Sequence, residues 1–166
     1  MSTQEPVISN SSPLIHLAKI DQLGLLPGCF GEVLIPRAVY DECVTEGRDR
    51  PEMAMIKQAA WLRVVEVENL DLVRLLRAEI DRGEAKAIAL ALEQRRSLLL
   101  LDDSDAREKA RILRLRMTGT LGVLLWAKRA GKIASLSDQL KALRDTGFWL
   151  SRRLTDRLLL EAGEGS

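Results

Sequence analysis

Short apolar runs alternate along the chain with longer stretches in which apolar residues recur every three or four positions. Runs of the first kind predict β-strands, and recurrence at helical spacing predicts α-helices. The most apolar run covers residues 97–101, which is typical of a strand buried on both faces. The other predicted strands are Val7–Ser9 and residues 33–35, 62–67 and 116–118.

Helices are predicted between and after these strands. For the first of them, polar residues 10–12 precede Pro13, which is the pattern of a helix start. Strands separated by helices favour right-handed crossovers and a mainly parallel sheet, so the sequence predicts an α/β fold. The predicted helices cover residues 14–20, 23–26, 36–43, 53–58, 70–80, 85–92, 103–113, 120–130, 135–146 and 151–162.

Size and charge narrow the class of protein. A chain of 166 residues suits one domain over 1–166, in which the helices from about residue 135 complete the core or form an interface. The 25 Lys and Arg residues nearly balance the 24 Asp and Glu residues, whereas a protein that coats nucleic acid is usually far more basic. Any contact with nucleic acid is therefore expected to come from a local patch.

The cysteine and histidine content argues against a zinc site, because the chain has two cysteines and only His16 to accompany them. Cys29 and Cys43 are expected to be reduced thiols. The sequence shows neither a signal-peptide pattern nor an apolar run of membrane length, so we expect a cytoplasmic protein with no membrane partner.

Candidate chemistry lies where the predicted strands end, because functional residues of parallel sheets gather beyond the strands' carboxyl ends. Taken singly, each polar residue there has a structural interpretation. Asn10 or Ser12 could cap the first helix, and Asp103 is an acceptable cap for a later one. Asp81 and Glu84 have the spacing of a capping box.

The combination of acids is harder to explain by capping alone. Asp102, Asp103 and Asp105 directly follow the most apolar strand, and clustered carboxylates repel one another unless a cation binds them. Carboxylates without nearby histidine or cysteine favour Mg²⁺ or Mn²⁺, which keeps water ligands that can attack a phosphodiester. The acids therefore predict a site for metal-dependent phosphoryl transfer.

Five segments carry a resemblance to a known family. In chain order they are VISNSSPLIHLAKI, GEVLIPRAVYDE, GEAKAIALALE, LLLLDDSDAR and MTGTLGVLLWAKRAGKI. Their order and spacing resemble PIN-domain proteins, and most of all a small prokaryotic subgroup similar to the ribonuclease toxins of type II toxin–antitoxin pairs. The resemblance implies a three-layer fold with a mainly parallel central sheet flanked by helices, and cleavage of RNA with Mg²⁺ or Mn²⁺.

Carried over by position, the resemblance implies catalytic and metal-binding roles for Glu42, Glu84 and Asp103, with Asp102 and Asp105 as further metal ligands. Asn10 stands where most active PIN nucleases have Asp. Its amide oxygen can still bind a metal, but it brings no negative charge.

Basic and polar residues beside these acids are candidates for contact with RNA. Ser12 could orient a phosphate. Arg107 and Arg111 recur at helical spacing after the acidic turn, where they could bind RNA phosphates or simply form a solvated helix face. Trp149 fits a core or interface anchor better than a base-stacking platform, because aromatic residues are scarce in this chain.

Three functional hypotheses remain. The first is a metal-dependent endoribonuclease, acting as a toxin restrained by an antitoxin protein. The second, favoured by Asn10, is a weakened or inactive PIN-like module that binds RNA or protein. The third takes the acidic turn at residues 102–105 as a phosphatase or receiver site, but such sites follow the first strand. The apolar run at residues 158–160 could finish the core or form a homodimer interface.

Overall fold

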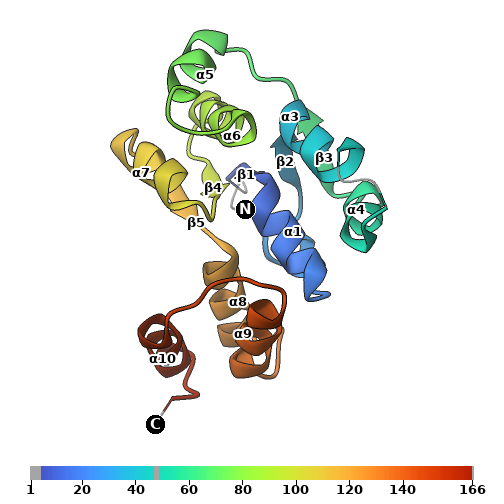
Figure 1. The fold of residues 1–166 in the computed structure, drawn as a ribbon, viewed down its shortest axis with the longest axis vertical. Helices are drawn as coiled ribbons and strands as arrows, with labels where there is room; N and C mark the ends of the chain where they lie inside the picture. The colour runs from blue at the N-terminus through green and yellow to red at the C-terminus, as the bar shows by residue number, and fades with distance from the viewer. Residues whose placement is uncertain (1–4, 47–48, 166) are drawn as a thin grey trace.

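The computed structural model describes residues 5–46 and 49–165 (Figure 1). Five parallel strands form one sheet in the order β3-β2-β1-β4-β5. They follow the predicted pattern, although β3 and β4 are shorter than expected. The strands are β1 (Val7–Ser9), β2 (Val33–Pro36), β3 (Leu62–Val65), β4 (Leu98–Leu100) and β5 (Arg116–Thr118).

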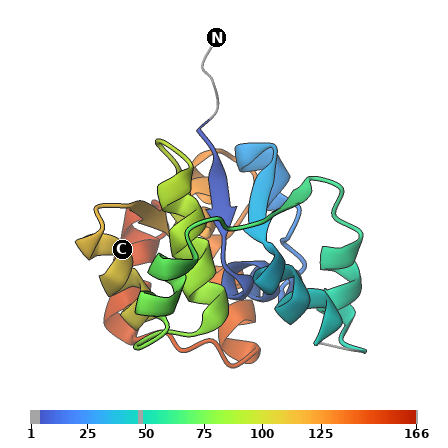
Figure 2. The same ribbon diagram turned by 90° about the horizontal axis from the view of Figure 1, so that it is seen from above.

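Alternation along the strands sends side chains to two separate hydrophobic clusters. Val7 of β1 and Leu100 of β4 pack into the cluster on one face. Ile8 and Leu99, which are partners in the register of the same two strands, pack into the cluster on the other face. Helices cover both faces (Figure 2). The protein therefore has the three-layer α/β architecture that the sequence predicts.

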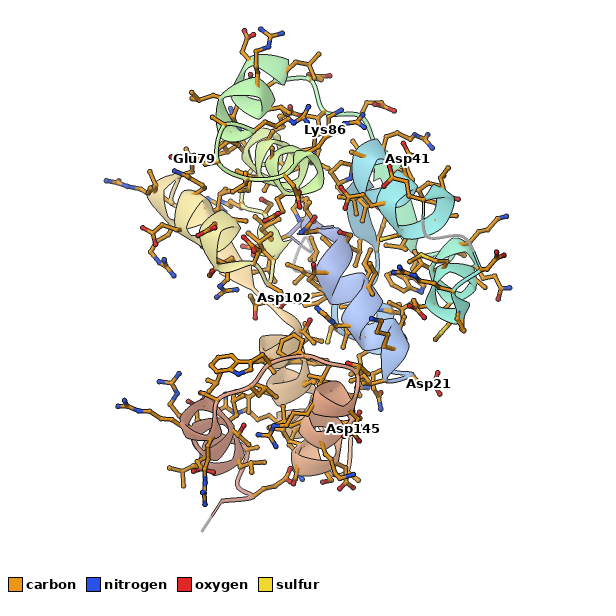
Figure 3. The ribbon with its side chains drawn as sticks, viewed as in Figure 1. Asp21, Asp41, Glu79, Lys86, Asp102 and Asp145 are labelled. Carbon is orange, nitrogen blue, oxygen red and sulfur yellow. The ribbon has the colours of Figure 1, made fainter. Side chains whose placement is uncertain are left out.

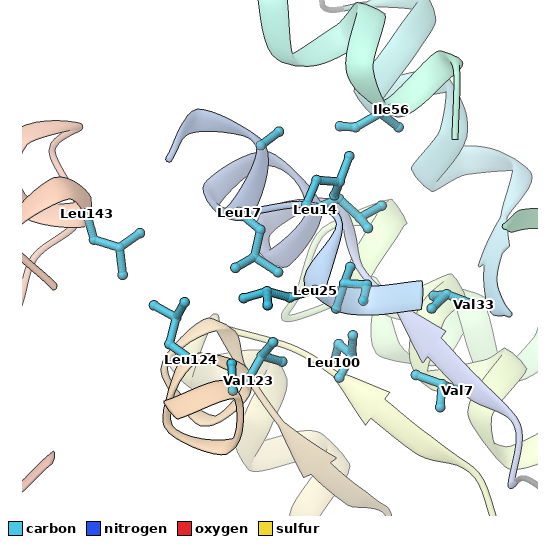
Figure 4. Packing of buried hydrophobic residues seen from close by; sticks show 14 of the residues in the cluster. Val7, Leu14, Leu17, Leu25, Val33, Ile56, Leu100, Val123, Leu124 and Leu143 are labelled. Atoms are coloured by element: carbon cyan, nitrogen blue, oxygen red, sulfur yellow. The ribbon is translucent and has the colours of Figure 1, made fainter. Parts of the chain in front are cut away.

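The first face holds the larger cluster, which includes Leu14, Leu17, Val123 and Leu124 (Figure 4). Buried leucines of the last helices, such as Leu143, belong to the same cluster, so these helices contribute to the core. The helices that cover this face are α1 (Ser11–Lys19), α2 (Leu25–Phe30), α4 (Pro51–Lys57), α8 (Thr120–Arg129), α9 (Leu136–Asp145) and α10 (Arg152–Glu161).

The apolar run near the end of α10 divides between the core and the surface. Leu158 is buried in the first cluster and Leu159 packs partly against it, whereas Leu160 is exposed. The core interpretation is thus confirmed for Leu158. A dimer interface that uses Leu160 stays a prediction.

The second face is covered by α5 (Leu70–Leu76), α6 (Arg82–Glu93) and α7 (Ser104–Ile112). The predicted helix over 70–80 ends at Leu76, and the one predicted from residue 85 begins three residues earlier, at Arg82. The early start follows from Asp81, whose side chain accepts a hydrogen bond from the Glu84 amide at 2.8 Å. That capping bond brings Glu84 into the first turn of α6.

The predicted helix over 36–43 is two elements, the α-helical turn α3 (Arg37–Tyr40) and the π-helix η1 (Asp41–Thr45). A π-helix is rare and is often found at a functional site, because it changes the direction in which the following side chains point. Here η1 carries Glu42. Across residues 5–46 and 49–165, no helix combines the length and the apolar character needed to cross a membrane.

Candidate active site

The carboxyl ends of β1 and β4 and the first turns of α6, α7 and α8 carry the polar residues of the candidate site. Asn10 follows β1, and its backbone N–H donates to the Leu100 carbonyl of the adjacent strand at 3.0 Å. Asp102 and Asp103 follow β4 directly, and Asp102 lies between α7 and α8 in Figure 3. The parallel register therefore places the ends of two strands side by side, as the sequence predicts.

Glu42 is held by two residues that lie far from it in the sequence. The Ser11 hydroxyl donates to Oε2 of Glu42 at 2.8 Å. On its other side the carboxylate lies against Gly83 of α6, so closely that an added Cβ there would come within 3.0 Å of Cδ, Oε1 and Oε2. Burial raises the pKa of Glu42, and the Ser11 hydrogen bond opposes that effect.

Glu84 is the most deeply buried acid of the site, with 7% of its surface exposed. Burial raises its pKa to about 9, and the carboxylates of Asp81 and Asp103 act in the same direction. Both carboxylates disfavour the charged form of Glu84, because like charges repel. Glu84 is therefore protonated near neutral pH when no cation is present.

Asp102 has a structural partner for each of its oxygens. Oδ1 accepts from the Thr120 amide at 2.8 Å, and Oδ2 accepts from the Thr120 hydroxyl at 2.6 Å. Gly119 makes this approach possible, because an added Cβ would lie 2.5 Å from Oδ1 of Asp102. Asp102 thus joins the end of β4 to the first turn of α8.

Asp103 caps α7, as expected, by accepting from the Ala106 amide at 2.9 Å through Oδ2. Asp105 lies in the first turn of the same helix and is exposed. Arg107 points back toward the sheet and donates to the Leu101 carbonyl at 2.7 Å. Arg111 is paired with Glu108 on the exposed side of α7, so part of its charge is already compensated.

Two buried oxygens of the site have no hydrogen-bond partner among the described residues, namely Oδ1 of Asn10 and Oε2 of Glu84. Asn10 is only 2% exposed, so bulk water does not compensate its amide oxygen. A buried polar atom left without a partner is costly, and such atoms often mark the place of a water or an ion.

The acids are not drawn together into a closed metal cage. Within the part of the chain that is described, no three His, Cys, Asp or Glu side chains are grouped closely enough to hold a metal ion. The reason is visible in the contacts above, since Glu42 is bound by Ser11 and Asp102 by Thr120. The six predicted metal-binding side chains therefore do not converge, and their roles as ligands stay predictions.

Sequence reasoning missed three residues of this site. Ser11, and not the neighbouring Ser12, contacts Glu42. Ser12 is half-buried, and its contact with RNA stays a prediction. Asp81 borders Glu84, and Thr120 binds Asp102. Of these, only Asp81 had a signal in the sequence, through its capping spacing, and the structure confirms the cap.

His16 connects the site to the end of the chain. Its ring meets that of Phe148 edge-on, with the ring centroids 4.8 Å apart. Burial lowers the pKa of His16, the charge of Asp102 raises it, and that of Lys19 lowers it. His16 is thus half-buried and packs against Phe148.

A family model described as a PIN domain matches residues 6–164. The chain belongs to the PIN-domain family. PIN domains are generally nucleases, typically use divalent metals and bind RNA. The resemblance that the sequence motifs suggested is thereby confirmed, and so is the fold that it implied. Among curated proteins, no sequence matches this chain.

Proposed function

We propose that this PIN domain is a metal-dependent endoribonuclease. The observation that carries the proposal is the pair of buried, unpartnered oxygens on Asn10 and Glu84, at two of the positions that the motif resemblance implies for metal-binding side chains. Amide and carboxyl oxygen atoms with free lone pairs fit Mg²⁺ or Mn²⁺. The donor chemistry therefore fits the cation, although the acids do not yet surround one point.

Asn10, Glu42, Glu84 and Asp103 are the residues that we expect to hold the cation, and Asp102 and Asp105 lie beside them. When bound, a divalent ion would neutralise these acids, polarise a phosphodiester and activate a water. The chain's own residues prepare the site for that chemistry. Ser11 fixes the Glu42 carboxylate at 2.8 Å, and Glu84 keeps a proton that it can give up on binding.

In this proposal the oxygen of a water bonds to phosphorus and the P–O bond to one nucleoside oxygen breaks. The proton that the water gives up balances the one that the leaving oxygen takes up. The carboxylates of Glu42 and Asp103 orient the attacking water. Arg107 lies next to the site, where it donates to the Leu101 carbonyl. Asp102 takes part indirectly, because it holds the first turn of α8 in place through Thr120.

Beyond the reaction, we propose that the protein acts in the cytoplasm as the toxin of a toxin–antitoxin pair. The order of its motifs, which resembles that of the small prokaryotic toxin subgroup, supports this role. An antitoxin protein and a second copy of the chain are the partners expected with it. The exposed side chain of Leu160 on α10 is available for a contact between copies.

A second function is favoured by Asn10 itself. An amide in place of a carboxylate removes one negative charge from the site, and the acids present do not form a three-carboxylate group in the described residues. Both features suit a PIN domain that has weak or no nuclease activity and binds RNA or a protein.

Cleavage of an end-labelled RNA mixture by the purified protein separates the two functions. With Mg²⁺ or Mn²⁺ the wild type should cut, and EDTA or Asp103→Asn should abolish cutting without unfolding the protein. Asp156→Asn, which removes an acid from the surface of α10, is the matched control and should stay active. A folded Asp103→Asn protein with full activity would refute the assignment of the site.

A further inference from the structure

Trp149 is exposed to an extent that the core does not explain. It lies between α9 and α10 with 82% of its surface exposed, so the expectation of a core anchor is wrong for this residue, while that of an interface anchor stays a prediction. Its neighbours do not share that exposure, since Phe148 packs against the first hydrophobic cluster and Leu150 is buried in it. A single exposed aromatic side chain is by itself smaller than the broad apolar patch of a stable protein interface.

The position of Trp149 relates it to the candidate active site. Phe148, the preceding residue, meets the His16 ring edge-on at 4.8 Å between centroids. His16 belongs to α1, which begins directly after Asn10, and the charge of Asp102 acts on it. The connection between α9 and α10 runs along the α8 end nearest Asp102 (Figure 3). Phe148, the residue before Trp149, is thus held against α1, the helix that follows Asn10.

Two cations follow Trp149 at the start of α10. Arg152 and Arg153 are both exposed, and neither forms an ion pair with another residue in the described ranges. Asp156, one turn later, is the nearest acid in the sequence on this helix. The helix start is fixed, because the Ser151 hydroxyl accepts from the Leu154 amide at 3.1 Å. Both guanidinium groups are therefore available to an anion, and they lie shortly after Trp149 in the chain.

We propose that Trp149 stacks on a base of single-stranded RNA while Arg152 and Arg153 bind the adjoining phosphates. An exposed indole next to uncompensated cations combines the two features by which proteins bind single strands without sequence preference. The inference rests on the proposed function for its assumption that RNA is the substrate. It adds a second place, outside the metal site, where the RNA is bound.

The test measures RNA binding without cleavage. Wild type and variants are titrated in EDTA against a fluorescein-labelled single-stranded RNA of about 12 nucleotides, with anisotropy as the readout. Trp149→Ala should weaken binding by about 5- to 150-fold, the range expected for loss of one stacked base. Trp149→Phe should keep most of the affinity and Trp149→Leu should lose it, because stacking needs an aromatic ring. The double variant Arg152→Gln/Arg153→Gln should reduce the slope of log K against log salt concentration by roughly 0.7 for each arginine removed.

Leu75→Ala is the matched control, since Leu75 is 72% exposed on α5, over the other face of the sheet. Its affinity should equal that of the wild type. Equal binding by Trp149→Ala and wild type would overturn the inference, as would a wild type that binds no single-stranded RNA in EDTA. A lower molecular mass of Trp149→Ala in light scattering, with RNA affinity unchanged, would also overturn it and assign Trp149 to contact between copies.

Cleavage with Mg²⁺ or Mn²⁺ is measured in parallel, so the two proposals can fail separately. A wild type that cuts RNA, together with a Trp149→Ala variant that binds normally, removes the stacking site and leaves the nuclease. A wild type that binds through Trp149 and does not cut supports the stacking site and refutes the nuclease.

Discussion

The Glu42 carboxylate lies against the α carbon of Gly83, in a space that any larger residue at position 83 would fill. This contact joins the π-helix after β2 to the first turn of α6, so it brings together two of the proposed catalytic elements. Glycine leaves room for the Glu42 carboxylate in this position, because the Cβ of a larger residue would push that side chain away.

Gly83→Ala should therefore lower RNA cleavage without lowering the stability of the fold. Alanine in a helix stabilises by about 0.5–1 kcal/mol relative to glycine, so the variant should unfold no earlier than the wild type. Its Cβ should displace Glu42 and lower RNA cleavage by about tenfold or more. Gly28→Ala in α2 is the control, since nothing lies within 4 Å of its added Cβ. Normal cleavage by a folded Gly83→Ala protein would show that the position of Glu42 is unimportant.

Glu84 should make the stability of the metal-free protein depend on pH. Its pKa is about 9 in the folded protein against an ordinary value of 4.5, so the folded state binds the proton more tightly than the unfolded chain. The stability that this tighter proton binding gives the folded state is fully present below pH 4.5 and is lost as the pH rises to about 9. Glu84→Gln should remove the loss and raise the free energy of unfolding at alkaline pH by about 1–3 kcal/mol.

Urea unfolding in EDTA, repeated across that pH range, measures the effect. Glu68→Gln removes an exposed carboxylate just before α5 and should leave the pH dependence of the wild type unchanged. A Glu84→Gln profile parallel to that of the wild type would mean that Glu84 is already charged in the folded protein.

The layers of the fold could be predicted because they depend on local patterns. The apolar run before Asp102 could be recognised as a central strand, and Asp103 could be recognised as a helix cap. Once the strands are parallel, the chain must bring Asn10 and Asp102 to the same edge. Periodicity and capping therefore sufficed for the backbone and for the approximate position of the acids.

The contacts within the site could not be predicted in the same way. Ser11 and Glu42 are 31 positions apart, and their hydrogen bond depends on how η1 packs against α1. The π-helix itself leaves no mark in the spacing of apolar residues. Trp149 shows the same limit, because composition favoured an anchor and the packing of Phe148 and Leu150 leaves the indole outside.

Asn10→Asp should make stability depend on a divalent cation. The new carboxylate would be buried at the carboxyl end of β1, and without a cation its charge should cost about 1–3 kcal/mol. Mg²⁺ or Mn²⁺ should restore the lost stability, by about 2.7 kcal/mol when the free ion is at 100 times its Kd. Thermal unfolding with the ion or with EDTA measures both effects.

Asn69→Asp is the control for that variant, because Asn69 caps α5 from an exposed position and Asp serves equally well as a cap. It should show no shift with the cation beyond that of the wild type. A melting temperature of Asn10→Asp that does not respond to Mg²⁺ or Mn²⁺ would contradict the placement of a cation beside Asn10.

Thr120→Val should destabilise the end of β4 by removing the hydroxyl that donates to Asp102 at 2.6 Å. Hydrogen bonds to charged groups contribute about 1.5–3 kcal/mol, and valine has nearly the same shape as threonine. Thr120→Ser keeps the hydroxyl and loses a methyl group, which costs about 1 kcal/mol. Urea unfolding should thus show a larger loss for valine than for serine, and the reverse order would exclude a stabilising role for the bond.

Binding of Mn²⁺, followed by electron paramagnetic resonance, shows whether the protein holds a cation beside Asn10 and Glu84. We expect one site in the wild type, weakened by about tenfold or more in Glu84→Gln and unchanged in Asp156→Asn. Asn10→Asp should bind more tightly, because a carboxylate replaces an amide. Equal binding by Glu84→Gln and wild type, or no site in either, would contradict a metal-dependent nuclease at this edge of the sheet.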